Sequence, residues 1–344
     1  MTVRLKKLAD QVVVITGASS GIGLTTARMA AARGARLVLV ARNEQALREL
    51  TDELNASGTE AIAVVADVGA EDAVRSVVEA AVERFGRIDT WVNNAGIGMY
   101  GGLLDAPIDD SRRLFDTNFW GVVYGSSAAA KYFQGRADHS PGAIINIGSE
   151  VSDRAVPLLG MYSASKHAVK GYTDALRMEL EKAKVPVSVT LVKPSATDTP
   201  FPEHGQNFMA EEPALPPPLY APEVVAEVIL HAAEHPVRDI FAGGRARLHS
   251  LQGSLVPRGV DRLMEALFFD KQKAPRPANR SDDALDRPTT GLHQRGAAPQ
   301  GKVYEVSLYT KAAMHPWITK LSLLCVALIV GAISYEATSQ PKKH

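Results

Sequence analysis

Strand-like and helix-like segments alternate regularly between Gln11 and Arg238. Short apolar, β-branched runs are separated by longer amphipathic stretches, which is typical of βαβ units in a parallel sheet with both faces covered. We predict strands at Val12–Thr16, Arg36–Ala41, Ala61–Ala66, Thr90–Asn94, Ala143–Gly148 and Val187–Val192, and helices that include Gly21–Arg33, Glu44–Ala56, Ala70–Phe85 and Tyr162–Lys184. The expected fold class is α/β, a doubly wound parallel sheet that binds ligands at the carboxyl ends of its strands.

A glycine-rich turn follows the first predicted strand and opens the first predicted helix. Its glycines stand in the order Gly-x-x-x-Gly-x-Gly. Glycine permits a tight turn and lets main-chain N–H groups approach a pyrophosphate at the helix N-terminus. A simple tight βα turn is the alternative, but the strand–turn–helix context favours dinucleotide binding. The residues expected to hold the cofactor here are Thr16, Gly17, Ser19, Ser20, Gly21, Ile22 and Gly23.

The end of the second predicted strand indicates which dinucleotide is bound. An acidic residue is expected there if the ribose 2′-hydroxyl is recognised, but this strand ends in Ala41-Arg42. An arginine can pair with a 2′-phosphate, and no carboxylate at this position repels one. The alternative is a solvated surface arginine. We predict that the cofactor is NADP.

Tyr162 and Lys166 are four positions apart, so a helix would present both side chains on one face. A tyrosine has an ordinary pKa of about 10, and an adjacent ammonium group would lower that pKa toward the range useful for proton transfer. Ser149, thirteen positions before Tyr162, could hold a substrate oxygen next to the phenol. The Tyr-x-x-x-Lys spacing alone is common by chance, so its weight depends on the glycine-rich turn upstream.

Taken together, these motifs resemble those of the short-chain dehydrogenase/reductase superfamily, in its single-domain Rossmann form. The resemblance covers about residues 8–243 and includes further motifs in the family's order. These are Asp67-Val68 after the third predicted strand, Asn93-Asn94-Ala95-Gly96 after the fourth, Asn118, Tyr162-Ser163-Ala164-Ser165-Lys166, and Pro194 after the sixth.

The resemblance implies that Asn118, Ser149, Tyr162 and Lys166 form a catalytic tetrad. Tyr162 would exchange a proton with the substrate oxygen as hydride passes to or from the nicotinamide. Lys166 would lower the tyrosine pKa and hold the nicotinamide ribose, while Ser149 would orient the carbonyl or alcohol. Asn118 would hold a water linked to Lys166. Taken singly, Asn118 could be an ordinary helix residue and Ser149 a strand-end cap.

The resemblance also implies several cofactor contacts. Asp67 and Val68 would contact the adenine, and Asn94, Ala95 and Gly96 would line the cofactor cleft. The family's usual Pro-Gly is Pro194-Ser195 here, which alters the main chain beside the nicotinamide. Either Thr197 or Thr199 would bond the carboxamide.

The composition of the chain indicates which partners and which cellular compartment to expect. The chain has 38 basic and 38 acidic side chains, which gives no reason to expect nucleic acid as a partner. Its one cysteine excludes an internal disulfide, and no zinc-ligand spacing is present, so we expect no metal. The N-terminus lacks a signal-peptide pattern, which indicates a catalytic part in the cytoplasm.

The pattern changes after residue 243. We predict a catalytic domain over residues 1–243, a helical extension over 244–270 and a disordered linker over 271–302, because the linker has few large apolar residues. A tail over 303–344 contains the apolar stretch Trp317–Tyr335, which is long enough for a transmembrane helix of about 28 Å. We expect membrane anchoring through this C-terminus. The alternatives are a helix docked on the domain or on a second subunit and a soluble cytoplasmic protein.

The sequence therefore favours an NADP(H)-dependent oxidoreductase that acts on a carbonyl or secondary alcohol. The proline-rich stretch 195–221 suggests a mobile lid. Its apolar residues Phe201, Phe208, Met209 and Leu215 suggest either an apolar pocket or core packing. Because a membrane anchor would keep the active site close to the bilayer, we predict a lipophilic small-molecule substrate. We also expect a homo-oligomer. The alternatives are a membrane-tethered nucleotide-binding regulatory or scaffold protein without turnover, and family chemistry other than redox, such as dehydration or epimerisation.

Overall fold

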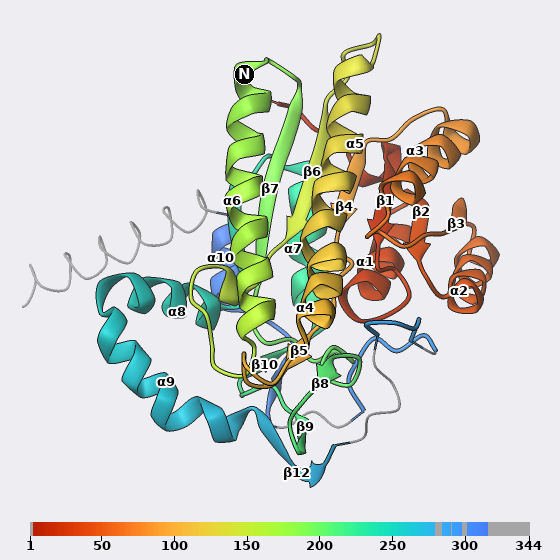
Figure 1. Ribbon diagram of the computed structural model, residues 1–344. Helices are drawn as coiled ribbons and strands as arrows, with labels where there is room; N and C mark the ends of the chain where they lie inside the picture. Colours follow the sequence, from red (N-terminus) through yellow and green to blue (C-terminus); the bar gives the residue numbers. More distant parts are fainter. Residues whose placement is uncertain (1–2, 279–283, 290, 298–300, 316–344) are drawn as a thin grey trace, which may run out of the picture.

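A seven-stranded parallel sheet lies at the centre of the computed structural model, which describes residues 3–278, 284–289, 291–297 and 301–315 (Figure 1). The strands are β1 (Val12–Thr16), β2 (Arg36–Ala41), β3 (Ala61–Val65), β4 (Thr90–Asn93), β6 (Gly142–Ile147), β7 (Val187–Pro194) and β11 (Asp239–Ala242). Their spatial order is β11-β7-β6-β4-β1-β2-β3. The strand order reverses between β1 and β4, which is the switch point of a doubly wound sheet. The predicted fold class is confirmed.

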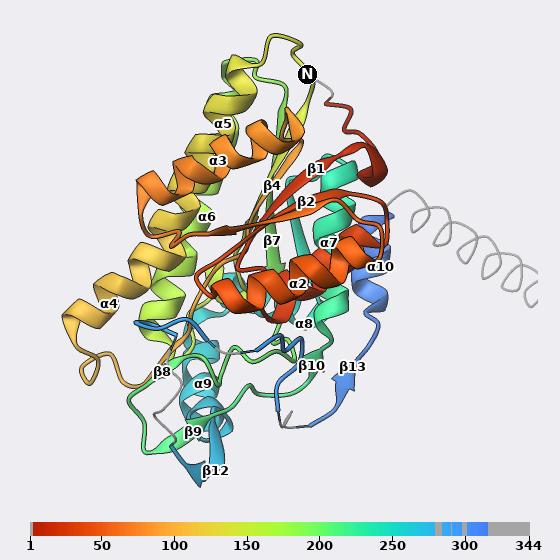
Figure 2. The ribbon, with the colours of Figure 1, turned by 90° about the vertical axis from the view of Figure 1, so that its right-hand side faces the viewer.

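Helices cover both faces of this sheet (Figure 2). The first face carries α1 (Gly21–Ala31), α2 (Glu44–Ala56) and α7 (Pro222–Glu234), and the second carries α3 (Glu71–Phe85), α5 (Gly121–Gly135) and α6 (Gly160–Lys182). The shorter helices near the site are α4 (Ile108–Phe115), a π-helical turn (Asp116–Trp120) and a 3-10 turn (Glu150–Ser152), and another 3-10 turn spans Leu8–Asp10. The predicted helices differ from the observed ones by two residues or fewer at each end.

The first strand shows why the predicted runs are continuously apolar. All five residues of β1 are buried. Val13 and Ile15 pack in the cluster under α1 and α7, whereas Val12 and Val14 pack in the cluster under α3 and α5. Successive side chains of a strand point to opposite faces, so a strand covered on both faces must be apolar throughout. This packing fixes the strand end, and with it the glycine-rich turn, at the switch point.

Short strand pairs and the C-terminal helices frame the carboxyl ends of the sheet. The pairs are β5 (Met99–Tyr100) with β8 (Gln206–Asn207), β9 (Glu211–Pro213) with β12 (Lys273–Pro277), and β10 (Leu219–Tyr220) with β13 (Val303–Tyr304). The helices are α8 (Gly244–Leu255), α9 (Pro257–Lys271) and α10 (Leu308–Met314). Met314 of α10 is buried in the core cluster of α1 and α7, so the chain returns to the central domain after the extension.

The described part of 271–302 differs from the predicted disordered linker. Lys273–Pro277 form β12, and residues 284–289 and 291–297, named here the C-terminal arm, lie against the Rossmann domain. Ala284 and Leu285 are buried in a cluster with Ile97 and Leu114. The prediction counted apolar side chains, but main-chain hydrogen bonds to distant residues hold much of this segment, and composition does not report them.

The described ranges contain no helix that is both long enough and apolar enough to cross a bilayer. The predicted transmembrane segment Trp317–Tyr335 lies outside these ranges.

Candidate active site

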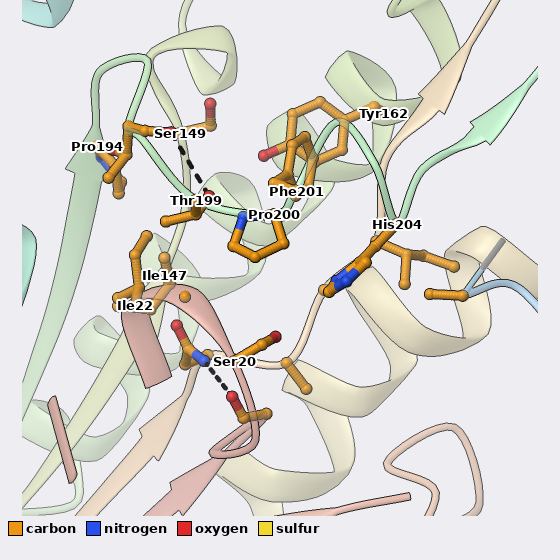
Figure 3. A pocket seen from close by; sticks show the side chains of 18 of the residues that line it. Ser20, Ile22, Ile147, Ser149, Tyr162, Pro194, Thr199, Pro200, Phe201 and His204 are labelled. Carbon is orange, nitrogen blue, oxygen red and sulfur yellow. Dashed lines mark hydrogen bonds between the residues drawn. The ribbon is translucent and has the colours of Figure 1, made fainter. Parts of the chain in front are cut away.

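One cavity at the carboxyl ends of the strands gathers most of the predicted site residues (Figure 3). The predicted residues that line it are Gly17, Ser19, Ser20, Gly21, Ile22, Arg42, Asp67, Val68, Asn94, Ala95, Gly96, Ser149, Tyr162, Lys166, Pro194, Thr197 and Thr199. The other three, Thr16, Gly23 and Asn118, lie behind this lining and support it.

The glycine-rich turn is locked to the end of β4. Gly17 has a φ of +66°, and a Cβ atom on it would lie 2.8 Å from the Cα of Ala95. A Cβ atom on Gly23 would lie 2.0 Å from the Gly17 carbonyl oxygen, so only glycine fits. The Thr16 hydroxyl accepts hydrogen bonds from the main-chain N–H groups of Asn94 and Ala95, each at 3.0 Å. The turn therefore brings main-chain N–H groups to the N-terminus of α1, an arrangement that suits the pyrophosphate of a nicotinamide dinucleotide.

Tyr162 lies in the first turn of α6, between Ser149 and Phe201. The Tyr162 and Phe201 ring centroids are 5.2 Å apart, and Figure 3 shows the two rings side by side. Burial raises the pKa of Tyr162 to about 12, a hydrogen bond with Ser149 lowers this pKa, and the charge of Glu150 raises it. The phenol is therefore protonated at neutral pH, in the form that can donate a proton to a carbonyl oxygen.

Lys166 lies one turn further along α6 and is 3% exposed. Its Nζ donates a hydrogen bond to the Ile147 carbonyl oxygen at 2.9 Å and lies 5.8 Å from the centre of the Tyr162 ring. Burial lowers the pKa of Lys166 to about 8. The expectation that Lys166 lowers the Tyr162 pKa is not met in this structure, because desolvation of the buried phenol outweighs the other effects on it.

Ser149 and Asn118 are both held by local backbone structure. Ser149 follows β6 and caps the 3-10 turn, where its side chain accepts a hydrogen bond from the Val151 N–H at 3.3 Å. Asn118 lies on the π-helical turn, a feature often found at functional sites. Its side chain exchanges hydrogen bonds with the main chain of Ile97 at 2.8 and 3.0 Å, and donates to Ser165 at 3.2 Å. Asn118 thus ties the strand-end loop to α6.

The segment after β7 closes another side of the cavity. The Thr197 hydroxyl donates to the Ser195 carbonyl at 2.8 Å, and the Thr199 hydroxyl donates to the Thr197 carbonyl at 3.5 Å. A Cβ atom on Gly21 would lie 3.1 Å from the Thr199 Cβ, so Thr199 packs directly over the glycine-rich turn. Both threonines therefore remain candidates for the carboxamide contact.

The C-terminal arm crosses the cofactor side of the cavity. The Arg42 guanidinium donates to the carbonyl groups of Leu285 at 3.2 Å and Arg287 at 3.3 Å, and also to that of Ala284. The Gly21 N–H, at the N-terminus of α1, donates to the His293 carbonyl at 2.8 Å. Two donors expected to serve a cofactor therefore also hold the arm.

Ion pairs anchor the far half of the arm. Arg295 pairs with Glu305 at 2.8 Å, with Glu223 at 3.0 Å and with Asp198 at 3.7 Å. Glu305 first, and then Glu223, raise the pKa of Arg295, while its partial burial acts in the opposite direction. The arm is thus fixed to the loop after β7 and to the start of α7, although its composition predicts no ordered structure.

The substrate side of the cavity combines Phe201 and Leu215, whose apolar side chains the sequence indicated, with residues that it did not indicate as site residues. Phe208 and Met209 of the same stretch pack in core clusters and do not line the cavity. The apolar wall of the cavity consists of Val151, Val156, Leu159, Phe201, Leu215 and Phe268. Glu150, Arg245 and Gln272 add polar groups to the same lining. Phe268 belongs to an apolar stripe that is more typical of core or dimer packing, and no local motif marks Arg245 or Gln272. Only the folding of α8 and α9 over the cavity brings these residues to it.

The family assignment follows from the sequence match. The family model described as short chain dehydrogenase matches residues 11–207. This range contains the glycine-rich turn, Ser149, Tyr162 and Lys166. The chain belongs to the short-chain dehydrogenase family. It is therefore an oxidoreductase by family, and the resemblance stated from the sequence is confirmed.

Two known proteins resemble the chain over most of its length. The uncharacterized oxidoreductase YxnA of Bacillus subtilis (strain 168) is 48% identical over 98% of this chain and 93% of its own length. An 11-beta-hydroxysteroid dehydrogenase A of Sesamum indicum is 37% identical over 69% of this chain and 68% of its own.

Two solved structures share the fold. A short chain dehydrogenase/reductase from Burkholderia phymatum in complex with NAD has a TM-score of 0.65 and 29% identity, over 73% of this chain and 96% of that one. An alcohol dehydrogenase from Thermococcus sibiricus complexed with 5-hydroxy-NADP has a TM-score of 0.59 and 26% identity. The match covers 67% of this chain and 95% of that one. One neighbour binds NAD and the other an NADP derivative, so the fold accommodates a nicotinamide cofactor of either kind.

Proposed function

We propose that this short-chain dehydrogenase interconverts a lipophilic ketone and the corresponding secondary alcohol, with NADP(H) as its cofactor. The observation that carries the proposal is the meeting of Ser149, Tyr162 and Lys166 in one cavity with the glycine-rich turn. A scaffold protein needs the nucleotide cradle but has no use for a buried phenol and a hydroxyl beside it.

Each of these side chains has a chemical role in the proposal. A bound nicotinamide supplies or accepts the hydride. Ser149 orients the substrate oxygen, and Tyr162 donates a proton to it during reduction or accepts one during oxidation. Lys166 holds the nicotinamide ribose and carries a positive charge next to the phenol. Asn118 acts indirectly, because it positions the loop after β4 and the first turns of α6.

Arg42 is the residue that supports NADP over NAD. It lines the cavity at the end of β2, where a 2′-phosphate of the adenosine ribose is expected. Its guanidinium has more N–H donors than the three bonds to the arm use, so it can bond the arm and a phosphate together. Asp67 and Val68, after β3, line the same end and would contact the adenine.

The apolar wall supports a lipophilic substrate. Phe201, Leu159 and Phe268 come from three different parts of the chain and line the same cavity as Ser149. Such a wall favours a substrate with a large apolar body. The hydroxysteroid dehydrogenase named among the relatives is consistent with this class, since a steroid alcohol has a reacting oxygen on a rigid apolar skeleton.

Cofactor oxidation with a panel of ketones tests this function. Purified full-length protein should oxidise NADPH faster than NADH in the presence of bulky ketones, and more slowly with small ones such as acetone. Cofactor binding without any turnover across the panel would favour the scaffold alternative. A faster reaction with NADH would contradict the proposed role of Arg42 while leaving the oxidoreductase function standing.

Anchoring through Trp317–Tyr335 is also part of the proposal and rests on the sequence alone. A chain that ends at His315 keeps α10 and the whole C-terminal arm, so it is the appropriate truncation. We expect full-length protein to sediment with membranes and to need detergent for extraction, whereas the shortened chain stays in the supernatant. Full-length protein that stays in the supernatant without detergent would refute the anchor.

A further inference from the structure

The C-terminal arm is attached on both sides of the cofactor end of the cavity. At its start, Leu285 is buried in a cluster with Leu114 of α4. At its end, the Arg295 guanidinium pairs with Glu223 of α7 at 3.0 Å and with Asp198 of the loop after β7 at 3.7 Å. In Figure 2 the blue segments of the arm lie between α4 and β13. The arm therefore runs from α4 across to the start of α7.

Between these two ends, hydrogen bonds hold the arm against residues of the cofactor site. The Thr289 carbonyl accepts a hydrogen bond from Nδ2 of Asn43, just after β2, at 2.5 Å. The His293 carbonyl accepts one from the N–H of Gly21, the first residue of α1, at 2.8 Å. The arm thus lies over the end of β2 and over the N-terminus of α1. These are the places where the adenosine ribose and the pyrophosphate of a dinucleotide are expected.

The arm bounds the cavity but does not fill it. Pro288 and Thr289 line the same cavity as Ser20 and Asp67, so open space lies between the arm and the strand ends. The first four N–H groups of a helix have no partner within it, and the arm takes the first of these in α1. The N–H of Ile22, which also lines the cavity, is bonded to no carbonyl group of the described residues. A pyrophosphate can therefore bind the start of α1 while the arm stays in place.

Beyond Leu285 the arm is held mainly by polar contacts. Leu292 is the only large apolar residue from 286 to 297, and it is partly buried. The side chain of Arg295 is 35% exposed, and those of its partners Glu223 and Glu305 are 40% and 63% exposed. Partly exposed ion pairs contribute little to stability, and a segment held by such contacts can open while the rest of the fold stays intact.

We propose that the C-terminal arm is the outer wall of the nucleotide site and acts as a strap over the bound cofactor. The dinucleotide binds between the strand ends and the arm, with Pro288 and Thr289 against its adenosine end, and it leaves when the arm beyond Leu285 detaches. Ala284 and Leu285 stay buried as the fixed end. This role of the arm rests on the proposed use of a nicotinamide cofactor. NADPH and NADH share the parts that the arm covers, so the strap retains both.

Hydrogen–deuterium exchange of the wild-type protein tests the strap directly. The main-chain N–H groups of Gly296 and Ala297 donate to Asp198 at 3.3 Å and to Glu203 at 2.8 Å, so their exchange reports opening of the arm. Bound cofactor stabilises the closed arm. Saturating NADPH should therefore slow exchange in peptides from 286–297 by about 3- to 10-fold. Unchanged exchange would overturn the proposal. Faster exchange would also overturn it, because the cofactor would then displace the arm.

Two variants loosen the arm at different elements. Arg295→Gln removes the ion pairs at the end of the arm, and Gln294→Ala removes hydrogen bonds to Thr25 and Arg28 of α1. Neither residue lines the cavity. Each variant should raise koff for NADPH and for NADH by about 3- to 10-fold, measured by stopped-flow displacement with excess NADP. The association rate should rise by a smaller factor, because the arm also contacts the bound cofactor, so Kd should rise.

Arg238→Gln is the matched control. Arg238 pairs with Asp174 at 2.9 Å and with Asp239, at the amino end of β11 and therefore at the opposite end of the sheet from the arm. This variant should keep the wild-type koff. Unchanged koff in Arg295→Gln and Gln294→Ala proteins shown to be folded by thermal unfolding would overturn the proposal. A fall in Kd would also overturn it, because the arm would then block the empty site. The exchange measurement decides the proposal if neither variant folds.

The outcomes separate the strap from the proposed function. If the protein binds neither NADPH nor NADH, the two fail together. If both cofactors bind and the arm variants release them no faster, only the strap is refuted. Neither measurement needs turnover, so a failure to reduce any ketone would contradict the oxidoreductase function and leave the strap standing.

Discussion

The guanidinium of Arg42 donates a hydrogen bond to the carbonyl oxygen of Leu285, 243 residues further along the chain. Arg42 directly follows β2 at the cofactor side of the cavity, and Leu285 belongs to the C-terminal arm. The residue proposed to select the cofactor is thus also a residue that holds the arm in place. The three bonds to the arm do not use all five N–H donors of the guanidinium, so a 2′-phosphate can bond Arg42 while the arm stays in place.

Substitution of Arg42 should therefore have two effects. Arg42→Ala should raise the Kd for NADPH by about 10- to 100-fold and change that for NADH much less, because only NADPH loses a charge-assisted contact. It should also loosen the arm, which limited proteolysis can detect.

Asn43→Ser is the matched control for the arm. Asn43 donates from Nδ2 to the Thr289 carbonyl at 2.5 Å and caps α2 through Oδ1. Serine retains a capping oxygen but loses the amide donor, so this variant should loosen the arm while keeping the preference for NADPH. A preference lost equally in both variants would mean that the arm, and not Arg42 itself, selects the cofactor.

Removal of the Tyr162 hydroxyl should stop the chemistry and spare cofactor binding. We expect Tyr162→Phe to lower kcat by about 10²- to 10⁴-fold, since the phenol transfers the proton. The Kd for NADPH, measured by fluorescence titration, should stay within about twofold because phenylalanine retains the ring packing against Phe201.

Tyr172→Phe provides the control on the same helix. The Tyr172 hydroxyl bonds to Ser127 at 3.2 Å on the far side of α6 and does not line the cavity. Its loss should leave kcat near the wild-type value. Substantial turnover by Tyr162→Phe would remove Tyr162 from the mechanism.

The pH dependence of alcohol oxidation should report the Tyr162 pKa. This pKa is about 12, so the phenol is protonated through the neutral range, and oxidation requires the form without its proton. We expect kcat/KM for oxidation to rise as the pH is raised from about 6 to 10. The hydrogen bond with Ser149 lowers this pKa, so Ser149→Ala should move the rising part of the profile to higher pH. A profile that is flat in both proteins would show that another group accepts the proton.

Acid should destabilise the fold through His231 of α7. Its ring stacks on His235 at 4.3 Å and meets His315 edge-on at 5.7 Å. Burial first, and then the charges of these two histidines, lower the pKa of His231 from 6.5 to about 4, while Glu234 acts in the opposite direction. The unfolded chain therefore binds a proton that the folded chain does not. The stability contribution is fully present above pH 6.5 and is lost as the pH falls toward 4.

His231→Gln tests this dependence. The variant should show a smaller fall in Tm between pH 6.5 and pH 4 than the wild type, because glutamine has no proton to gain. His139→Asn, in an exposed loop, should keep the wild-type slope. Identical slopes in all three proteins would contradict the effect attributed to His231.

Local patterns in the sequence predicted much of the central domain. The apolar run Val12–Thr16 predicts a strand covered on both faces, and β1 is buried on both. The glycine-rich turn and the spacing of Tyr162 and Lys166 placed these groups in one cavity, because parallel strands present their carboxyl ends at the same edge of a sheet. Strands, turns and the spacing of side chains along a helix depend on residues that are close in the sequence, so they can be predicted from the sequence alone.

Only the tertiary structure decided the state of Tyr162 and the surroundings of the cofactor. Lys166 stands at the predicted spacing, but burial beside Phe201 and Glu150 sets the direction of the Tyr162 pKa. The position of the C-terminal arm also depends on the tertiary structure. Main-chain carbonyl groups such as that of Leu285 bond Arg42 in the folded chain, but every residue has such a group, so the pattern of side chains cannot predict these bonds. Gln272 reaches the cavity wall only where α9 meets the loop before α6. The sequence by itself determined the strands, the turn and the order of reactive side chains. Desolvation and long-range hydrogen bonds depend on residues that come into contact only after folding. These two effects determined the pKa of Tyr162, the position of the C-terminal arm and the surroundings of Gln272.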